Sequence, residues 1–197
     1  MTAAPVPFPA AARSLLRDTI LSAVDQLART RGWAATTMAD VARAAGVSRQ
    51  TVYNEFSSRP TLVEAYLARE VDSLVSAVDA AVRASGDDPH RALQEAFALF
   101  LRLASDEPVV QVIVSDSGEA DLHRLLTGIG QAVATERIAA LIPEVWPQVG
   151  VADARLLAET LVRLAISYAL VPGQAADAVA ADVARMLSSF VDEILAR

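Results

Sequence analysis

The sequence predicts an all-α fold. Apolar residues recur every three or four positions along most of the chain, which places them on one face of successive helices. The alternation of apolar and polar residues that marks a half-buried strand is missing. Glycines, prolines and side-chain caps divide the helical pattern into segments. We therefore expect a protein built from packed helices.

The composition limits what kind of protein this is. A chain of 197 residues forms one domain or two modest ones, and either choice buries a substantial core. Apolar residues make up 53% of the chain, yet there is no uninterrupted apolar run of about 18 residues, the length that a membrane span needs. We expect no membrane partner, and we expect the apolar surplus to be buried in a dimer interface or a ligand cavity.

The chemistry-bearing residues do not favour catalysis or metal binding. There is no cysteine, which excludes disulfides and thiolate catalysis and fits a reducing cytoplasm. The two histidines, His90 and His123, lack a second ligand at metal-site spacing. Ser115, Asp116 and His123 lack the strand-to-helix turn of a nucleophile elbow. We expect no catalytic residue, no metal and no cofactor, and thus no enzyme.

The chain is expected to begin with a disordered arm and a long helix. Three prolines among the alanines of residues 1–10 are typical of such an arm. The first helix is expected from about Ser14 to Thr30, with Gly32 as its stop signal. The later helices are expected at residues 38–45, 48–54, 59–84, 89–104, a short stretch from 108, 118–142, 152–171 and 175–196.

The second and third helices have the spacing of a helix-turn-helix. Thr37 and Asp40 form a start like that of a capping box, and Gly46 ends the short helix that follows. Ser48 offers a side-chain oxygen as the cap of the next helix, only one turn further along. Two short helices joined by a turn that contains glycine are the signature of this motif.

Residues 47–56, VSRQTVYNEF, have the division of faces that a DNA-reading helix requires. Val47, Val52 and Phe56 are expected to pack inward. The polar residues left to face outward are Arg49, Gln50, Thr51, Tyr53 and Asn54. Arginine suits guanine edges, and glutamine and asparagine suit adenine edges. The net charge of the chain is -7, but residues 1–60 carry +3 and the remainder carries -10, so the basic end holds the motif.

The stretch TTMADVARAAGVSRQTVYNEFSSRPTLVEAY, residues 36–66, resembles the DNA-binding domain of the tetracycline-repressor (TetR) family. This resemblance implies that Thr37, Ser48, Thr51, Tyr53 and Arg59 contact phosphates. It implies that Arg49, Gln50 and Asn54 touch bases or the nearby backbone. The family usually has Lys where this chain has Arg59, and an acidic or small polar residue where it has Pro60.

The resemblance also implies that the chain has two domains with different functions. Residues 11–58 are expected to be the DNA-binding domain, and residues 59–197 a helical ligand-binding and dimerisation domain. The candidates for lining the ligand cavity are Phe97, Phe100, Leu103, Ile113, Leu126, Ile129, Trp146, Leu164 and Tyr168. The candidates for the dimer interface are Leu157, Leu161, Leu164, Val183, Met186, Leu187 and Phe190. Arg102, Arg124 and Arg163 are possible anchors for an acidic head group.

The motif and the resemblance together predict a cytoplasmic homodimer that binds an inverted repeat in double-stranded DNA and is released by a small apolar effector. The resemblance implies that the protein is a repressor. A helical small-molecule carrier or enzyme without DNA binding is one alternative. A protein–protein adaptor is another. The sequence leaves open the effector, the operator and its genes, the sign of regulation, and whether one or two dimers bind each operator.

Overall fold

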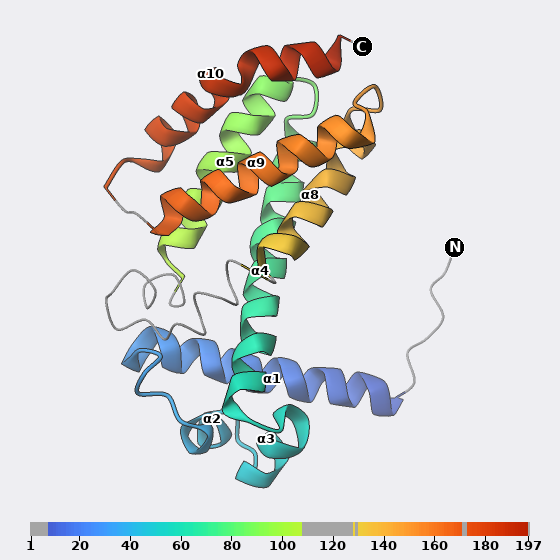
Figure 1. Cartoon of the computed structure of the whole chain (residues 1–197). Helices are drawn as coiled ribbons and strands as arrows, with labels where there is room; N and C mark the ends of the chain where they lie inside the picture. The colour runs from blue at the N-terminus through green and yellow to red at the C-terminus, as the bar shows by residue number, and fades with distance from the viewer. Residues whose placement is uncertain (1–7, 108–127, 129, 171–172, 197) are drawn as a thin grey trace. The chain divides into compact units, whose positions relative to one another are not determined.

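The computed structural model describes residues 8–107, 128, 130–170 and 173–196. Within these residues all regular structure is helical, which confirms the all-α prediction. The helices of Figure 1 are α1 (Phe8–Arg31), α2 (Met38–Ala44), α3 (Arg49–Phe56), α4 (Arg59–Ala84), α5 (Pro89–Ser105), α8 (Gln131–Val145), α9 (Val151–Leu170) and α10 (Ala176–Leu195). None of these helices combines the length and the apolar character needed to cross a membrane.

Two described helix ends differ by three residues or more from those that the sequence pattern predicts. Helix α1 begins at Phe8, so the last three residues of the expected arm, 8–10, are helical. Pro9 is accepted there because the first-turn amide that it lacks has no partner within a helix. Helix α8 continues through Pro143 to Val145, three residues beyond the expected end at Ile142. The expected helix from residue 108, and residues 118–127 of the expected helix 118–142, lie outside the described residues.

The chain forms two compact units that divide between Tyr66 and Leu67, inside α4. The first unit contains α1, α2, α3 and the first two turns of α4, with α2 packed against both α1 and α3 (Figure 1). Its core consists of side chains that are at most 1% exposed: Ile20, Val24, Val41, Val52, Phe56 and Tyr66. Residues 59–66 therefore pack with the first unit, whereas the sequence pattern places the boundary at the start of α4.

Tyr66 explains where this boundary lies. Its side chain is fully buried, and its hydroxyl donates a 2.9 Å hydrogen bond to the Asp25 carboxylate on α1. Its ring stacks on the buried Trp33 ring, with 5.9 Å between the ring centroids and 7° between the ring planes. These contacts attach the beginning of α4 both to α1 and to the connection that leads into α2.

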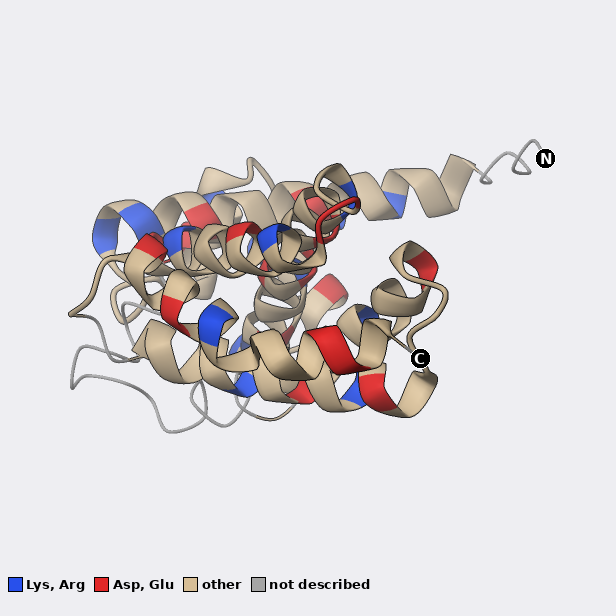
Figure 2. Cartoon of the chain, turned by 90° about the horizontal axis from the view of Figure 1, so that it is seen from above, with Lys and Arg blue, Asp and Glu red and all other residues tan. Residues whose placement is uncertain are grey.

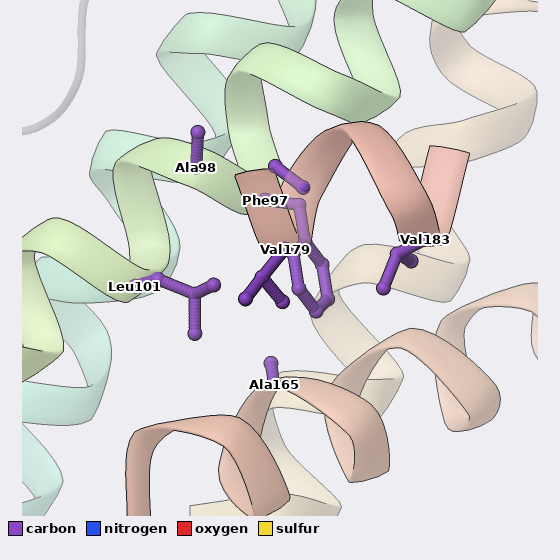
Figure 3. Close-up of a cluster of buried hydrophobic side chains, with 7 residues drawn as sticks. Phe97, Ala98, Leu101, Ala165, Val179 and Val183 are labelled. Carbon is purple, nitrogen blue, oxygen red and sulfur yellow. The ribbon is translucent and has the colours of Figure 1, made fainter. Parts of the chain in front are cut away.

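The second unit joins its helices through three apolar clusters. One cluster connects α5, α9 and α10, and Figure 3 shows Phe97, Ala165 and Val179 from these three helices converging. A second connects α8, α9 and α10, and a third connects α4, α5 and α8. Several fully buried contact positions are alanines, such as Ala92, Ala154 and Ala180. Because alanine is small, the helix backbones can approach closely at these positions.

Helices α5 and α8 are also held by the break at residues 85–88. The Trp146 indole Nε1 donates a 2.9 Å hydrogen bond to the Gly86 carbonyl. A Cβ atom at Gly86 would lie 2.9 Å from the Val145 side chain, so a larger residue at this position would push the turn away from the end of α8. Asp88 then caps α5 by accepting a 3.0 Å hydrogen bond from the Arg91 amide.

Replacing Tyr66 with Phe should lower the free energy of unfolding by about 1–2 kcal/mol, because the Asp25 carboxylate loses a part-buried donor while the packing of the ring is kept. Urea unfolding followed by circular dichroism measures this difference. Tyr168→Phe is the matched control, because Tyr168 is 38% exposed, and it should leave the unfolding curve unchanged. Equal stability of Tyr66→Phe and the unmutated protein would contradict a structural role for this hydroxyl.

Candidate nucleic-acid interface and apolar cavity

Helix α2 begins with a reciprocal pair of side-chain contacts. The Asp40 amide donates a 3.2 Å hydrogen bond to the Thr37 hydroxyl oxygen, and the Thr37 hydroxyl donates a 2.5 Å hydrogen bond to the Asp40 carboxylate. Arg43 donates to the same carboxylate over 2.9 Å. The Thr37 hydroxyl first, and Arg43 after it, hold the pKa of Asp40 below its ordinary value. The Thr37 side chain is exposed as well as engaged in this cap.

The turn from α2 to α3 depends on Gly46 and Ser48. Gly46 has a φ of +68°, a conformation that residues with a Cβ atom seldom adopt. The Val47 amide then donates a 3.0 Å hydrogen bond back to the Ala42 carbonyl. The Ser48 hydroxyl accepts a 3.0 Å hydrogen bond from the Thr51 amide and so caps α3. The helix-turn-helix that the sequence predicts is therefore present.

The two faces of α3 differ as a groove-reading helix requires. Val52 and Phe56 are fully buried, whereas Arg49, Gln50 and Asn54 are exposed. The outward side chains pair one turn apart. Gln50 donates a 2.9 Å hydrogen bond to Asn54, and Arg49 donates one of 3.3 Å to the half-buried Tyr53 hydroxyl. The helix thus presents a short row of hydrogen-bonding groups that can contact base edges and phosphates.

Arg59 lies at the first residue of α4, beside the buried Trp33. Its guanidinium carbon is 5.3 Å from the centre of the Trp33 ring, and it donates a 3.3 Å hydrogen bond to the Trp33 carbonyl. An arginine stacked on an aromatic ring is held in a fixed orientation, which a lysine at this position would not reproduce. This contact gives a physical reason for arginine at position 59, where the family that the sequence resembles usually has lysine.

The structure brings to α3 two arginines that the sequence analysis does not assign to the site. Arg13 and Arg17 of α1 both contact Glu55, near the end of α3. Their spacing of four residues places them on one face of a helix. Nothing in the sequence connects that face to a carboxylate about 40 residues away. Charged residues of both signs are interspersed along the helices (Figure 2), so composition alone does not reveal such pairs.

The second unit encloses an apolar cavity of about 150 Å³. Residues of α4, α5, α8, α9 and α10 line it, and the described lining residues carry no charged or hydroxyl side chain. The lining includes Phe97, Phe100 and Trp146 of the sequence-based candidates and does not include Leu103, Leu164 or Tyr168. The remaining three candidates, Ile113, Leu126 and Ile129, lie outside the described residues.

The arginines considered as head-group anchors do not line the described cavity. Arg102 pairs with Asp177 over 2.5 Å, and Arg163 pairs with Glu159 over 2.5 Å. Arg124 lies outside the described residues. Exposed pairs of this kind are common on protein surfaces and contribute little to stability.

The apolar residues expected at a dimer interface have different environments. Leu157 and Val183 are 8% and 2% exposed and belong to the core clusters of a single chain. Four other interface candidates are partly buried and pack against those clusters: Leu161, Leu164, Leu187 and Phe190. Met186, in contrast, is 63% exposed, as is Leu156 on α9 at 54%. An interface on α9 and α10 would therefore use exposed residues such as Leu156 and Met186.

Replacing Thr37 with Val should raise the pKa of Asp40 toward its ordinary value, because the hydrogen bond from the Thr37 hydroxyl stabilises the ionised carboxylate more than any other contact does. A lowered pKa in the folded protein means that the ionised carboxylate stabilises α2 above the unfolded-state pKa. This stabilisation is lost as the pH falls through the lowered value. Carbon NMR titration of the Asp40 carboxyl group measures the shift.

Ser48→Ala is the control for this titration. It removes a cap from α3 rather than from α2, so the pKa of Asp40 should stay lowered. A titration midpoint that is the same in Thr37→Val and in the unmutated protein would show that the hydroxyl does not set the charge of Asp40.

Comparisons with known proteins agree along the whole chain. A family model described as "Bacterial regulatory proteins, tetR family" matches residues 20–66, and one described as "Bacterial Tetracyclin repressor, C-terminal domain" matches residues 88–189. The transcriptional regulator AlkX of Mycobacterium tuberculosis is 39% identical over 197 residues, which cover 97% of this chain and 93% of that protein. The transcriptional activator FasR of Mycolicibacterium smegmatis is 40% identical over 87 residues, which cover 43% of this chain and 40% of that protein.

A solved structure extends the agreement to three dimensions. The crystal structure of the TetR family repressor AlkX from a Dietzia strain, implicated in biodegradation of n-alkanes, superposes with a TM-score of 0.78. The two sequences are 31% identical, and the match covers 89% of this chain and 97% of that one. The fold of this chain is thus similar to that of a TetR family repressor over most of its length. This protein belongs to the TetR family of bacterial transcriptional regulators.

Proposed function

We propose that this regulator binds an inverted repeat in double-stranded DNA as a homodimer and releases it when a small apolar effector enters the cavity of the second unit. The structure of α3 is the main support for the proposed DNA binding. This helix is capped at Ser48, set on a glycine turn, anchored by Val52 and Phe56, and polar on its outward face. Groups placed in this way suit the edges of bases in a major groove.

A dimer is required by the geometry of the proposed DNA site. Two recognition helices that enter successive major grooves lie about 34–36 Å apart, or a multiple of this distance, so one chain reads only one half-site. Two-fold symmetry places two copies of α3 on an inverted repeat. Exposed apolar side chains on α9 and α10, among them Leu156 and Met186, support these helices as the interface.

The cavity supports an effector with an uncharged hydrocarbon body. Its described lining consists of aliphatic and aromatic side chains together with Pro89 and Gly130, so a charged group placed inside would lose its hydration without gaining a partner. The Dietzia relative is described as implicated in biodegradation of n-alkanes, and hydrocarbon chains are the ligand class that this lining suits. We propose repression that the effector relieves. The relatives include both a repressor and an activator, so the sign of regulation needs its own measurement.

Helix α4 is the element through which the effector would act. Five of its residues line the cavity, and the same helix begins in the first unit. Arg137 of α8 contacts Asp72 and Ser76 of α4, and Glu144 of α8 pairs with Arg83 of α4 over 2.5 Å. An effector that favours a different spacing of α4 and α8 would shift α4 and thereby change the spacing of the two recognition helices.

Selection of duplex fragments from the host's genomic DNA tests the proposed DNA binding. The affinity for the selected fragments should fall steeply as salt rises, because each phosphate contact releases counterions. Gln50→Ala should weaken binding about 5- to 150-fold and relax the preference at one base position. The control Arg91→Ala changes a 66% exposed side chain of α5, and this variant should bind normally. A protein that prefers no fragment, with or without added hydrocarbons, would favour a carrier or an adaptor instead.

Filling the cavity tests the proposed effector class. Ala134 lines the cavity, so Ala134→Phe should abolish the rise in melting temperature that 1-decanol produces in the unmutated protein, and it should also make DNA release insensitive to 1-decanol. Ala140→Phe is the matched control, because Ala140 is exposed on the same helix and does not line the cavity. An undiminished response in Ala134→Phe would place the effector elsewhere.

A further inference from the structure

The carboxylate of Glu55 on α3 is held by two arginines from α1. The Arg13 Nε donates hydrogen bonds of 3.1 and 3.0 Å to the two carboxylate oxygens of Glu55. The Arg17 Nη1 lies 3.5 Å from the same carboxylate and donates a 3.1 Å hydrogen bond to the Glu55 main-chain carbonyl. The Glu55 side chain is only 12% exposed. The pairing is therefore a built feature of the first unit.

The position of Glu55 makes this pairing relevant to DNA. Helix α3 has eight residues and is therefore about 12 Å long, so Glu55 lies next to the exposed Asn54 and less than two turns from the exposed Gln50. An unpaired carboxylate at this place would repel the phosphates of a bound duplex. With Arg13 and Arg17 beside it, the three-residue group carries a net charge of +1 and attracts them instead.

Arg13 and Arg17 differ in their exposure and in the number of contacts that they make within the first unit. The Arg17 guanidinium lies 4.5 Å from the centre of the buried Phe56 ring and is 38% exposed, so it packs α1 against α3. Arg13 is 64% exposed, and it contacts Glu55 through Nε alone. Within the described residues, its two terminal nitrogens make no hydrogen bond. Because the Glu55 carboxylate binds only Nε, the two terminal nitrogens of Arg13 can donate hydrogen bonds to an acceptor on a bound molecule.

Arg13 also lies outside the residues that match the family's DNA-binding domain. The family model for that domain matches residues 20–66, whereas α1 begins at Phe8. The extra turns of α1 carry Arg13 and Arg17 to the recognition helix. Arg17 makes both the ring contact with Phe56 and the main-chain contact with Glu55, whereas Arg13 contacts only the Glu55 carboxylate.

We propose that Arg13 is an additional DNA-backbone contact, carried to the recognition helix by the N-terminal extension of α1 and oriented by Glu55 so that its terminal guanidinium nitrogens bind a phosphate. This proposal rests on the proposed DNA binding of the chain. The contact adds affinity without reading sequence, because a phosphate is the same at every base pair. A dimer would make the contact twice, once in each half-site.

The test measures the salt dependence of binding for Arg13→Gln, using duplexes that the unmutated protein has selected from genomic DNA. Two lost phosphate contacts per dimer should reduce the slope of log affinity against log salt by about 1.8, and at about 0.1 M salt should weaken binding roughly 10- to 100-fold. The loss should be the same for every selected duplex. Arg13→Lys keeps the charge and should recover most of the slope.

Arg91→Gln is the matched control. It makes the same change of charge at a 66% exposed arginine of α5 that also pairs with a carboxylate through Nε, and it should leave the slope unchanged. Circular dichroism melting should show that Arg13→Gln folds as the unmutated protein does. An unchanged slope in a folded Arg13→Gln protein overturns the proposal while leaving DNA binding intact. A loss confined to some duplexes also overturns it, because such a residue reads bases. If the unmutated protein selects no DNA, the proposed function itself fails.

Discussion

The anchoring of Tyr66 is the contact on which the rest of the arrangement depends. Its buried hydroxyl binds Asp25, and its ring stacks on Trp33, so the first two turns of α4 are fixed to α1 and to the connection that leads into α2. The remaining turns of the same helix line the cavity of the second unit. A helix resists changes of its own length because every turn is hydrogen-bonded to the next. Helix α4 therefore contributes both to the core of the first unit and to the wall of the cavity.

Contacts inside the first unit hold the proposed recognition helix, α3, in place. Ser48 caps it, Gly46 sets its direction, and Val52 and Phe56 secure its inner face. Because the backbone and inner side chains are held, only the outward side chains need to adjust when a duplex binds, which limits the entropy lost on binding. Arg17 adds to this preparation by stacking on Phe56 from α1.

The second unit combines close packing with an apolar cavity. Alanines at the helix contacts bring backbones together at Ala92, Ala154 and Ala180, while larger residues such as Phe97 and Trp146 stand around the cavity. The clusters between α5, α9 and α10 give the space a fixed wall on one side. On the side of α4 and α8, polar contacts at Arg137 and Arg83 add to the apolar cluster that connects these helices with α5. Such contacts exchange with water more easily than buried apolar packing does.

Local patterns in the sequence determined the helices, their caps and the polar face of α3, because capping, glycine turns and three- to four-residue periodicity act over a few residues. Tertiary structure decided the rest. Leu157 and Val183 have the periodicity of an interface yet belong to the core of one chain, and only packing distinguishes these two uses of an apolar residue. The pairing of Arg13 with Glu55 joins positions 42 residues apart. No local rule predicts such a pair, because it depends on where the fold places α1 against α3.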